Sequence, residues 1–266
     1  MSLLSVVTAV YGPSARYLPD THASLLAQNM PAGWDWEWLV QEDGDGVNAA
    51  TYLPGDDPRI RIASARHGGP HVARTVALGR SHGSLIKTLD ADDVLLPGTL
   101  TRDINLLTDR PEIGWTTSRA LDLLPDGSTR GYLGDPEAGL IKRGTVLAGW
   151  RLSQRPMVHP ATLCARRELI ALLGGWMALP ASGDTALLLG LDALRDGWLL
   201  NEPGMLYRVH ADQITQHPHH SEGDEWSARM RVMEERAEAL HRWLNVGSVL
   251  DTPGLPGHGS SAVPPE

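Results

Sequence analysis

The first 110 residues alternate between strand-type and helix-type segments, and this alternation constrains the fold more than any other feature of the chain. Apolar runs rich in β-branched residues predict strands over 4–10, 36–41, 59–63 and 84–89. Amphipathic runs between them predict helices over 19–28 and 71–82. Strands that alternate with helices form parallel sheets with helices on both faces, so the sequence predicts an α/β fold.

Polar residues follow three of these strands at the point where each strand ends. The first strand is followed by Tyr11, the second by the acidic turn 42–46 and the last by the run 89–93. The carboxyl ends of parallel strands meet at one edge of a sheet, where open α/β sheets bind their ligands. We therefore expect the three strand ends to form one crevice.

The run Leu89-Asp90-Ala91-Asp92-Asp93 is the strongest chemical signal at this edge. Two aspartates two residues apart in an extended chain point to the same side, where one divalent ion can bridge them to a substrate phosphate. The alternative is an acidic loop that caps a helix beginning near Pro97, because Asp is a common N-cap and turn residue.

Composition narrows the function classes. With 266 residues, 42% of them hydrophobic, the chain can bury a full core. Its net charge of −9 argues against a nucleic-acid surface, which needs clustered Lys and Arg. The single Cys164 forms no intramolecular disulfide, so a reducing, cytoplasmic setting is expected, and no Cys/His cluster has structural-zinc spacing. The apolar N-terminus lacks a basic region and predicts a strand rather than a signal peptide, and we expect no membrane span.

Beyond about residue 110, Gly and Pro interrupt the alternation. We predict a strand over 158–164, a helix over 167–173 that ends at a Gly pair, and a helix over 185–194. A longer amphipathic helix is predicted over 221–244. Its apolar stripe, expected to be core, comprises Trp226, Met230, Met233, Ala237, Leu240 and Leu244. The Gly-, Pro- and Ser-rich end of the chain is expected to be disordered.

The order and spacing of several short motifs resemble the family 2 inverting glycosyltransferases with the GT-A fold. The motifs that carry this resemblance are SVVTAVYG at 5–12, SLLAQ at 24–28, LVQEDG at 39–44, DPRIR at 57–61, GGPHVAR at 68–74 and LDADD at 89–93. The match covers most of residues 3–110 and continues in islands, which are RRE at 166–168, GGW at 174–176, GD at 183–184 and YRVH at 207–210.

This resemblance implies a GT-A-like, Rossmann-type nucleotide-binding sheet and transfer of a sugar from a nucleoside-diphosphate donor with inversion. With the C-terminal patterns described above, the chain is expected to divide into a donor-binding half at 1–110, an acceptor-binding half of the same domain at 111–215, a C-terminal amphipathic helix at 216–250 and a disordered tail at 251–266. The acceptor is expected to be a hydroxyl or amine of a small soluble molecule.

For the donor, the resemblance implies that Thr8, Val10 and Tyr11 line the base and ribose and that Asp43 accepts a hydrogen bond from the base. The alternative for Asp43 is a turn residue, because Asp-Gly-Asp-Gly is strong turn chemistry. Asp90 is expected to contact the ribose or assist the metal ion.

The resemblance also implies a Mg²⁺ or Mn²⁺ ion, with Asp92 as its main ligand. Asp93 either ligates the ion or caps the following turn, and His210 approaches the metal or the diphosphate. Arg74 either pairs with a phosphate or forms a salt bridge to a strand-end aspartate, because a guanidinium suits both partners.

An inverting transfer needs one carboxylate to take the proton of the acceptor, and Asp184 is the candidate general base. The family usually shows Glu-Asp at this place, and Gly183 stands here instead of the Glu. The alternative is that Asp184 caps the helix that follows it, and Asp192 and Asp196 are less well placed as bases.

Other polar and aromatic residues have weaker assignments. His159 either contacts a sugar hydroxyl or is a satisfied core histidine. Trp34, Trp36, Trp38 and Trp176 are candidates for stacking on a ligand, with Trp176 best placed, although most tryptophans are packing residues. The His-rich tract 217–220 matches no strong metal site.

Of three other functions, two enzymatic ones are disfavoured by the sequence and one non-enzymatic function remains open. A sugar nucleotidyltransferase needs a Gly-rich basic loop after the first strand, and a dinucleotide-dependent oxidoreductase needs G-x-G-x-x-G there; neither motif is present. A catalytically inactive nucleotide-binding or partner-binding module is the non-enzymatic alternative, kept open by Gly183. The sequence does not choose the donor base, the acceptor or the oligomeric state.

Overall fold

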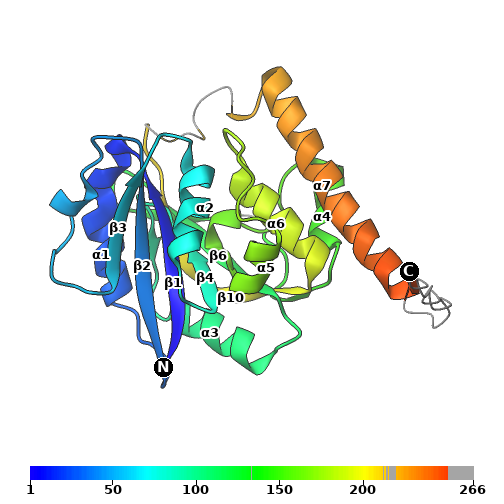
Figure 1. Cartoon of the computed structure of the whole chain (residues 1–266), viewed down its shortest axis with the longest axis horizontal. Coiled ribbons are helices and arrows are strands. Elements are labelled where there is room, and N and C mark those ends of the chain that lie inside the picture. Colours follow the sequence, from blue (N-terminus) through cyan, green and yellow to red (C-terminus); the bar gives the residue numbers. More distant parts are fainter. Residues whose placement is uncertain (133, 212, 214, 216–219, 251–266) are drawn as a thin grey trace, which may run out of the picture.

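A computed structural model describes residues 1–132, 134–211, 213, 215 and 220–250. Its centre is a ten-stranded sheet with the strand order β3-β2-β1-β4-β9-β6-β10-β5, in which β7 pairs with β6 and β8 with β10 (Figure 1). The strands are β1 Ser2–Val10, β2 Trp34–Asp43, β3 Ile60–Ala65, β4 Leu85–Thr88, β5 Val94–Leu95, β6 Trp115–Leu123, β7 Thr129–Gly131, β8 Gly139–Ile141, β9 Cys164–Arg166 and β10 Gly197–Arg208.

Seven α-helices and three short 3₁₀ turns connect the strands in the described part of the chain. The helices are α1 Leu18–Leu26, α2 Pro70–Arg80, α3 Thr99–Asp109, α4 Thr145–Ser153, α5 Arg167–Leu172, α6 Gly183–Leu194 and α7 Gly223–Leu250. The turns are η1 Gly12–Tyr17, η2 Ala49–Thr51 and η3 Pro160–Thr162.

The strands and helices predicted in the first 110 residues are confirmed. β3, β2, β1 and β4 are parallel neighbours, as the alternation predicts. The second half corrects the expectation of a parallel sheet, because β9 runs antiparallel between β4 and β6. The sheet is therefore mixed.

The predicted strand over 158–164 is wrong. Pro160 begins the turn η3, and the first strand residue is Cys164. The Oγ1 of Thr162 accepts a hydrogen bond from the backbone N–H of Ser118 and donates to the carbonyl of His159 at 2.7 Å. These side-chain bonds replace the ladder bonds that a strand would make, and Pro160 has no N–H to donate to a ladder.

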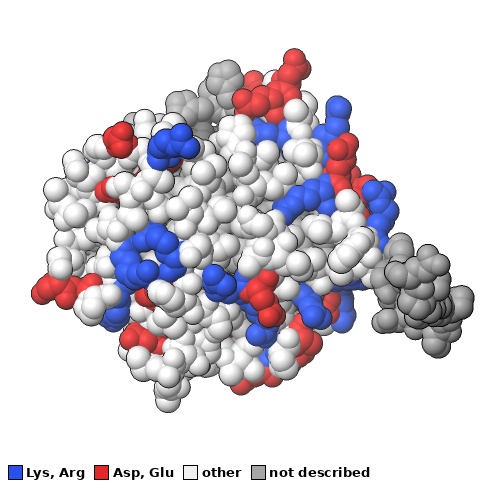
Figure 2. All heavy atoms as spheres, in the orientation of Figure 1, with Lys and Arg blue, Asp and Glu red and all other residues white. Residues whose placement is uncertain are grey.

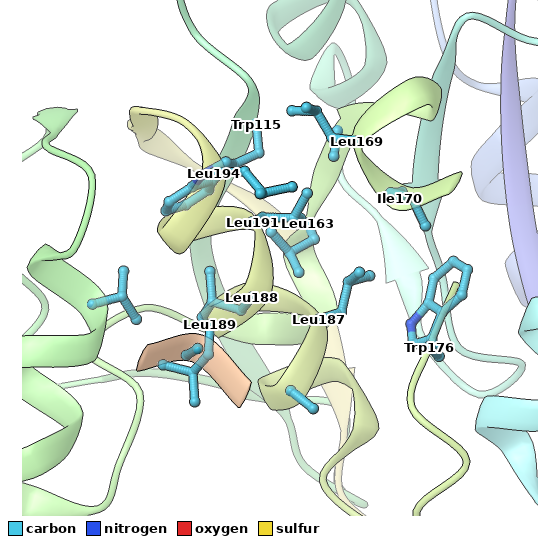
Figure 3. Close-up of a cluster of buried hydrophobic side chains, with 14 of the residues drawn as sticks. Trp115, Leu163, Leu169, Ile170, Trp176, Leu187, Leu188, Leu189, Leu191 and Leu194 are labelled. Carbon is cyan, nitrogen blue, oxygen red and sulfur yellow. The ribbon is translucent and has the colours of Figure 1, made fainter. Parts of the chain in front are cut away.

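Adjacent side chains of the central strands point to opposite faces of the sheet and pack against different helices. Val6 and Leu85 belong to a core with α1 and α3, whereas Val7 and Ile86 belong to a core with helices α2 and α4–α7. Figure 3 shows the second core, in which leucines of α6 pack against Trp115 and Trp176. Helices therefore cover both faces of the sheet, as predicted.

The predicted stripe of the C-terminal helix is core. Met230, Met233 and Ala237 of α7 are buried, and the remaining three stripe residues pack partly buried against the same cluster. α7 lies along the outer side of α6 in Figure 1. Two arginines of α7 reach across this seam, Arg229 to the Ser182 hydroxyl at 2.9 Å and Arg236 to the Leu173 carbonyl at 2.8 Å. On another side of the helix, Glu234 and Glu238 pair with Arg151 of α4.

Acidic and basic side chains are interspersed on the face shown in Figure 2, including along α7. This mixed pattern differs from the clustered basic surface that non-specific binding of nucleic acid requires. Among the described helices, none combines the length and apolar character needed to cross a membrane.

Candidate functional site

The carboxyl ends of β1, β2 and β4 lie side by side, because the three strands are parallel neighbours in register. Val10 pairs with Glu42, and Val7 pairs with Thr88, two residues before Asp90. The residues predicted from the three strand ends are thus brought to one edge of the sheet.

Thr8 and Val10 are buried in this edge. The Thr8 hydroxyl donates to the Leu89 carbonyl at 2.8 Å and accepts from the Trp38 indole N–H at 2.8 Å. The Val10 side chain is in the core with α1 and α3. Their side chains therefore tie strands together, which leaves the backbone of this segment to line a ligand.

Asp43 is buried at the end of β2, and its carboxylate accepts backbone hydrogen bonds from Gly68 at 2.7 Å and from Gly69. It thereby fixes the turn that leads into α2, as the turn alternative expects. His67 Nδ1 lies 3.1 Å from the second oxygen of Asp43, and the exposed Tyr11 ring lies against His67. Asp43, His67 and Tyr11 form a polar and aromatic group at this edge of the sheet.

Arg74 joins the two halves of the chain. Its guanidinium donates to Asp90 at the end of β4 and, at 3.2 Å, to Asp184 in the first turn of α6. Burial by itself lowers the pKa of Arg74, but the two carboxylates raise it above its usual value, so the residue stays charged. The salt-bridge alternative is the one present in the structure.

The pKa of Asp90 is raised to about 6. Burial is the main cause, and the nearby carboxylates of Asp184 and Asp92 raise it further, whereas Arg74 lowers it. A group of carboxylates around one buried cation leaves a surplus of negative charge, which favours a bound cation.

Asp184 does not cap α6. Ser182 is the N-cap residue, and Asp184 lies in the first helical turn. One carboxylate oxygen accepts from the Trp176 indole N–H at 2.8 Å and the other from Arg74. The side chain of Asp184 is 19% exposed, so a ligand can reach its carboxylate.

Asp92 and His210 come together although 118 residues separate them. His210 Nε2 lies 2.7 Å from Asp92 Oδ2. A cavity of about 330 Å³ opens beside His210, lined also by Tyr17, Arg208 and the segment 123–127. The structure thus brings these two candidate metal ligands into contact.

Asp93 is turned away from this pair and buried. One oxygen accepts from the backbone N–H of Arg208 at 3.0 Å, and among the described residues the other has no hydrogen-bond partner. Burial raises the pKa of Asp93 well above its usual range, and Asp92 and Asp90 raise it further. Asp93 therefore anchors the end of β10 to the acidic loop.

None of the three aspartates caps α3, which begins after Gly98 without a side-chain cap. Asp90 instead binds Arg74 of α2, and Asp92 binds His210 in the segment after β10. Asp93 accepts the backbone N–H of Arg208 in β10. The alternative of an acidic capping loop is therefore wrong.

The fit of a metal ion rests on Asp92 and His210. Within the described part of the chain, no three His, Cys, Asp or Glu side chains gather into a group that could hold a metal ion. A carboxylate and an imidazole nitrogen at 2.7 Å are nevertheless suitable donors for an ion that takes its other ligands from a diphosphate and water. Asp92 and His210 can thus supply two of the ligands of a divalent ion.

A second cavity, of about 300 Å³, lies in the half of the chain after residue 110. Its polar and aromatic lining comprises Arg119, Tyr132, Asp135, Arg155 and His159. His159 packs between the rings of Tyr132 and Tyr207, and burial lowers its pKa, so it is neutral near pH 7. The cavity wall thus combines an uncharged imidazole with arginine and carboxylate groups.

The tryptophans divide between core and site. Trp36 and Trp38 are buried, and Trp34 packs partly buried against the same core. Trp176 is also buried, with its indole N–H on Asp184. Of the tract 217–220, only His220 is among the described residues.

Sequence reasoning gave no role to four residues that the structure places at the site: Tyr17, His67, His71 and Arg208. The Tyr17 ring contacts both the Arg208 guanidinium and the His210 ring. His71 lies three residues before Arg74 on the same face of a helix, a spacing that could have indicated a shared site. The other contacts are long-range and have no local sequence signal.

A model of the family described as glycosyl transferase family 2 matches residues 5–168. No curated protein matches the chain. Among solved structures, S. aureus TarS 1–349 in complex with UDP-GlcNAc is similar with a TM-score of 0.68 at 16% identity, over 92% of this chain and 72% of that one. The same protein in complex with UDP gives a TM-score of 0.64 at 16% identity, over 94% and 73%. At these identities the structural likeness shows a shared fold.

Proposed function

The chain belongs to glycosyl transferase family 2 and is a glycosyltransferase with the GT-A fold, and from this premise we propose that it is a metal-dependent inverting enzyme that uses a UDP-sugar. The family and the UDP-bound structural neighbours support the donor class. The observation that supports the proposed catalytic site is the contact of Arg74 with both Asp90 in the first half of the chain and Asp184 in the second. This contact supports the proposal, because it links Asp184, the candidate base, to a strand end where the donor is expected.

In this proposal the donor lies across the ends of β1, β2 and β4. The base lies against Tyr11, His67 and the backbone near Thr8 and Val10, within reach of Asp43. Asp43 already accepts backbone hydrogen bonds, but a carboxylate has about four acceptor positions and can take one more. Arg74 holds Asp90 and Asp184 in place, and its charge favours the diphosphate nearby.

Asp92 and His210 would hold the Mg²⁺ or Mn²⁺ ion. The ion, when bound, stabilises the negative charge that grows on the departing nucleoside diphosphate. Asp93, the third candidate ligand, accepts the backbone N–H of Arg208 at 3.0 Å, and this contact supports a role in holding the loop. Arg208 reinforces that role, because its side chain also binds the Asp92 carbonyl at 2.8 Å.

Asp184 acts as the general base. The acceptor oxygen or nitrogen forms a bond to the anomeric carbon, the bond from that carbon to the diphosphate oxygen breaks, and Asp184 takes the acceptor proton. The hydrogen bonds from Trp176 and Arg74 hold the carboxylate in one orientation before the acceptor arrives.

The acceptor enters from the cavity lined by Tyr132, His159 and Arg155. Its volume of about 300 Å³ suits a small molecule, and aromatic faces beside arginine and carboxylate groups suit a hydroxylated one. We therefore keep a small acceptor with a hydroxyl or amine as the proposed second substrate.

Thermal stabilisation of the full chain by nucleoside diphosphates, with and without Mn²⁺, tests the donor site. A bound ligand raises the Tm by mass action, so UDP with Mn²⁺ is expected to raise it more than UDP alone and more than TDP or GDP. If no nucleotide raises the Tm under any condition, the donor assignment is wrong.

Turnover tests the catalytic step. The full chain should release UDP from UDP-sugars in the presence of a suitable acceptor, and Asp184→Asn should lower kcat by about 10²- to 10⁴-fold while UDP binding is unchanged. Asp109→Asn, an exposed change on α3, is the matched control. Binding of UDP without turnover across a broad acceptor panel would favour the inactive module instead.

A further inference from the structure

The start of α6 depends on a contact between Gly183 and the buried side chain of His71 on α2. A Cβ atom added at Gly183 would lie 2.2 Å from Cδ2 and 2.3 Å from Cγ of the His71 ring, far inside van der Waals contact. Only 4% of His71 is exposed. The imidazole therefore fills the space that any side chain at position 183 would need.

His71 also hydrogen-bonds to both ends of the segment that leads to Asp184. Nδ1 lies 2.7 Å from the Leu179 carbonyl oxygen, and the Gly183 N–H donates to Nε2 at 3.0 Å. Nδ1 must carry the proton to donate to a carbonyl, so the lone pair is on Nε2. The Gly183 N–H is one of the helix N-terminal donors that have no partner within the helix, and the imidazole satisfies it.

The neutral form of His71 is the one that makes both bonds. Desolvation by burial lowers the pKa of His71, and Arg74 and Arg229 lower it further, whereas Asp184 raises it. Nε2 lies 3.9 Å from Asp184 Oδ2, beyond hydrogen-bond distance. His71 thus acts on Asp184 through the backbone of the helix start rather than through a proton.

The same face of α2 holds the rest of this segment. The Thr75 hydroxyl accepts from the Trp176 backbone N–H at 3.0 Å and lies 3.2 Å from the Trp176 carbonyl. A Cβ at Gly175 would lie 2.7 Å from Thr75. Gly183 thus makes room for His71 and Gly175 makes room for Thr75. These two side chains of α2 flank Arg74 in sequence.

We propose that His71 is a positioning residue that orients the Asp184 carboxylate, an inference that rests on the proposed function. The imidazole fills the space beside Gly183 and hydrogen-bonds to the Leu179 carbonyl and the Gly183 N–H. Without the imidazole, the first turn of α6 loses its anchor, and Asp184 can rotate away from the acceptor. Misplacement of a reacting group by about 1 Å can cost about a hundredfold in rate.

Turnover of His71 variants tests the positioning role in the full chain with a UDP-sugar donor. His71→Ala is expected to lower kcat about 10- to 100-fold, with the KM for the donor and the Kd for UDP changed less than about twofold. His71→Gln, whose amide oxygen can accept from the Gly183 N–H, is expected to recover most of kcat with the pH profile of the native chain. His82→Ala, an exposed change just beyond the end of α2, is the control.

Three results of this experiment would overturn the proposal. His71→Ala with native kcat shows that Asp184 needs no such anchor. An equal loss in UDP affinity shows that His71 acts on the donor site. His71→Gln that is as inactive as Asp184→Asn shows that His71 exchanges a proton itself.

A stability measurement separates this inference from the proposed function. Gly183→Ala is expected to lower the Tm of the native chain, because its Cβ overlaps the imidazole. The same change in His71→Ala is expected to raise the Tm, because the space is open and Ala favours a helix over Gly. Equal effects in the two backgrounds would refute the packing relation. If instead the Tm effects differ in sign and Asp184→Asn keeps full turnover, the proposed base is wrong and the packing relation stands.

Discussion

At the scale of single residues, a substitution of Asp92 or His210 is expected to change the proposed metal binding most directly. The pair has one carboxylate and one imidazole, and both side chains are largely buried beside a cavity of about 330 Å³. Asp92 lies in the acidic run that the sequence indicated, whereas its partner comes from the segment after β10. The proposed metal site therefore depends on both halves of the chain.

Asp92→Asn removes the negative charge without changing the shape of the side chain. UDP affinity measured by titration calorimetry with Mn²⁺ is expected to fall at least about tenfold, and affinity without Mn²⁺ is expected to stay the same. His210→Gln should show a smaller loss of the same kind, and Asp109→Asn should show none. A native response to Mn²⁺ in Asp92→Asn would rule out this aspartate as a ligand.

At the scale of elements, β4 is joined to α3 by a fully buried ion pair. The Lys87 ammonium donates to Asp103 at 2.7 Å and to the Thr162 carbonyl at 2.7 Å, and the Thr116 hydroxyl donates to the other Asp103 oxygen. Lys87 lies in β4, three residues before Asp90. The sequence pattern predicts only a strand position for Lys87, because its partners are distant in sequence.

Lys87→Met leaves the Asp103 carboxylate buried without its cation. The free energy of unfolding, from urea denaturation, is expected to fall by about 3–5 kcal/mol. The double change with Asp103→Leu should recover a large part of this loss, because an apolar pair leaves no uncompensated charge. Lys142→Met, at an exposed ion pair, should cost less than about 1 kcal/mol. Equal costs for the two lysines would contradict this account.

Asp192 links α6 to the start of α4 and should make stability depend on pH. Its carboxylate accepts from the Leu147 N–H at 3.0 Å, and burial raises its pKa from 3.8 to about 6, although backbone hydrogen bonds lower it. The folded state therefore holds this proton more tightly than the unfolded state. Its contribution to stability is present below about pH 4 and is lost as pH rises through about 6.

The expected size follows from a pKa difference of about two, which corresponds to about 3 kcal/mol. Asp192→Asn keeps an acceptor for the Leu147 N–H but does not titrate. Its free energy of unfolding should therefore decline less than that of the native chain between pH 4 and pH 7, measured by urea denaturation at each pH. A decline equal to that of the native chain would show that Asp192 does not titrate in this window.

At the scale of the whole molecule, α7 closes the core that surrounds α6. Met230, Met233 and Ala237 are buried against the leucines of α6. Burying each of the two methionines contributes about 1.5–3 kcal/mol, and their sum of about 3–6 kcal/mol is a large part of the roughly 5–15 kcal/mol by which a typical domain is stable. The helix is therefore part of the fold and not an appendage.

A chain that ends at residue 222 is expected to lose cooperative thermal unfolding by circular dichroism and to bind a dye that reports exposed apolar surface. A chain that ends at residue 250 is the matched control and should keep the native Tm, because the tail at 251–266 is predicted to be disordered. A cooperative native-like transition in the shorter chain would show that the core of α6 is complete without α7. A lower Tm in the longer one would contradict the prediction for the tail, which lies outside the described residues.

The sequence by itself determined the local part of this protein. Period-two and helical patterns identified β1 to β4, the helices between them and the acidic residues at the strand ends, because these features depend on neighbours in sequence. The motif order also identified the family. The division into donor and acceptor halves and the cytoplasmic location stay predictions.

Only the tertiary structure decided which side chains meet. β9 enters the sheet antiparallel, β6 carries the buried polar residues Thr116 to Ser118, and β10 contains a Pro-Gly irregularity, so the sequence patterns there were weak. The contacts of Arg74 with Asp184 and of Asp92 with His210 span more than 100 residues. Such contacts arise from the packing of α2 and β10 against the strand ends, and no local periodicity in the sequence predicts them.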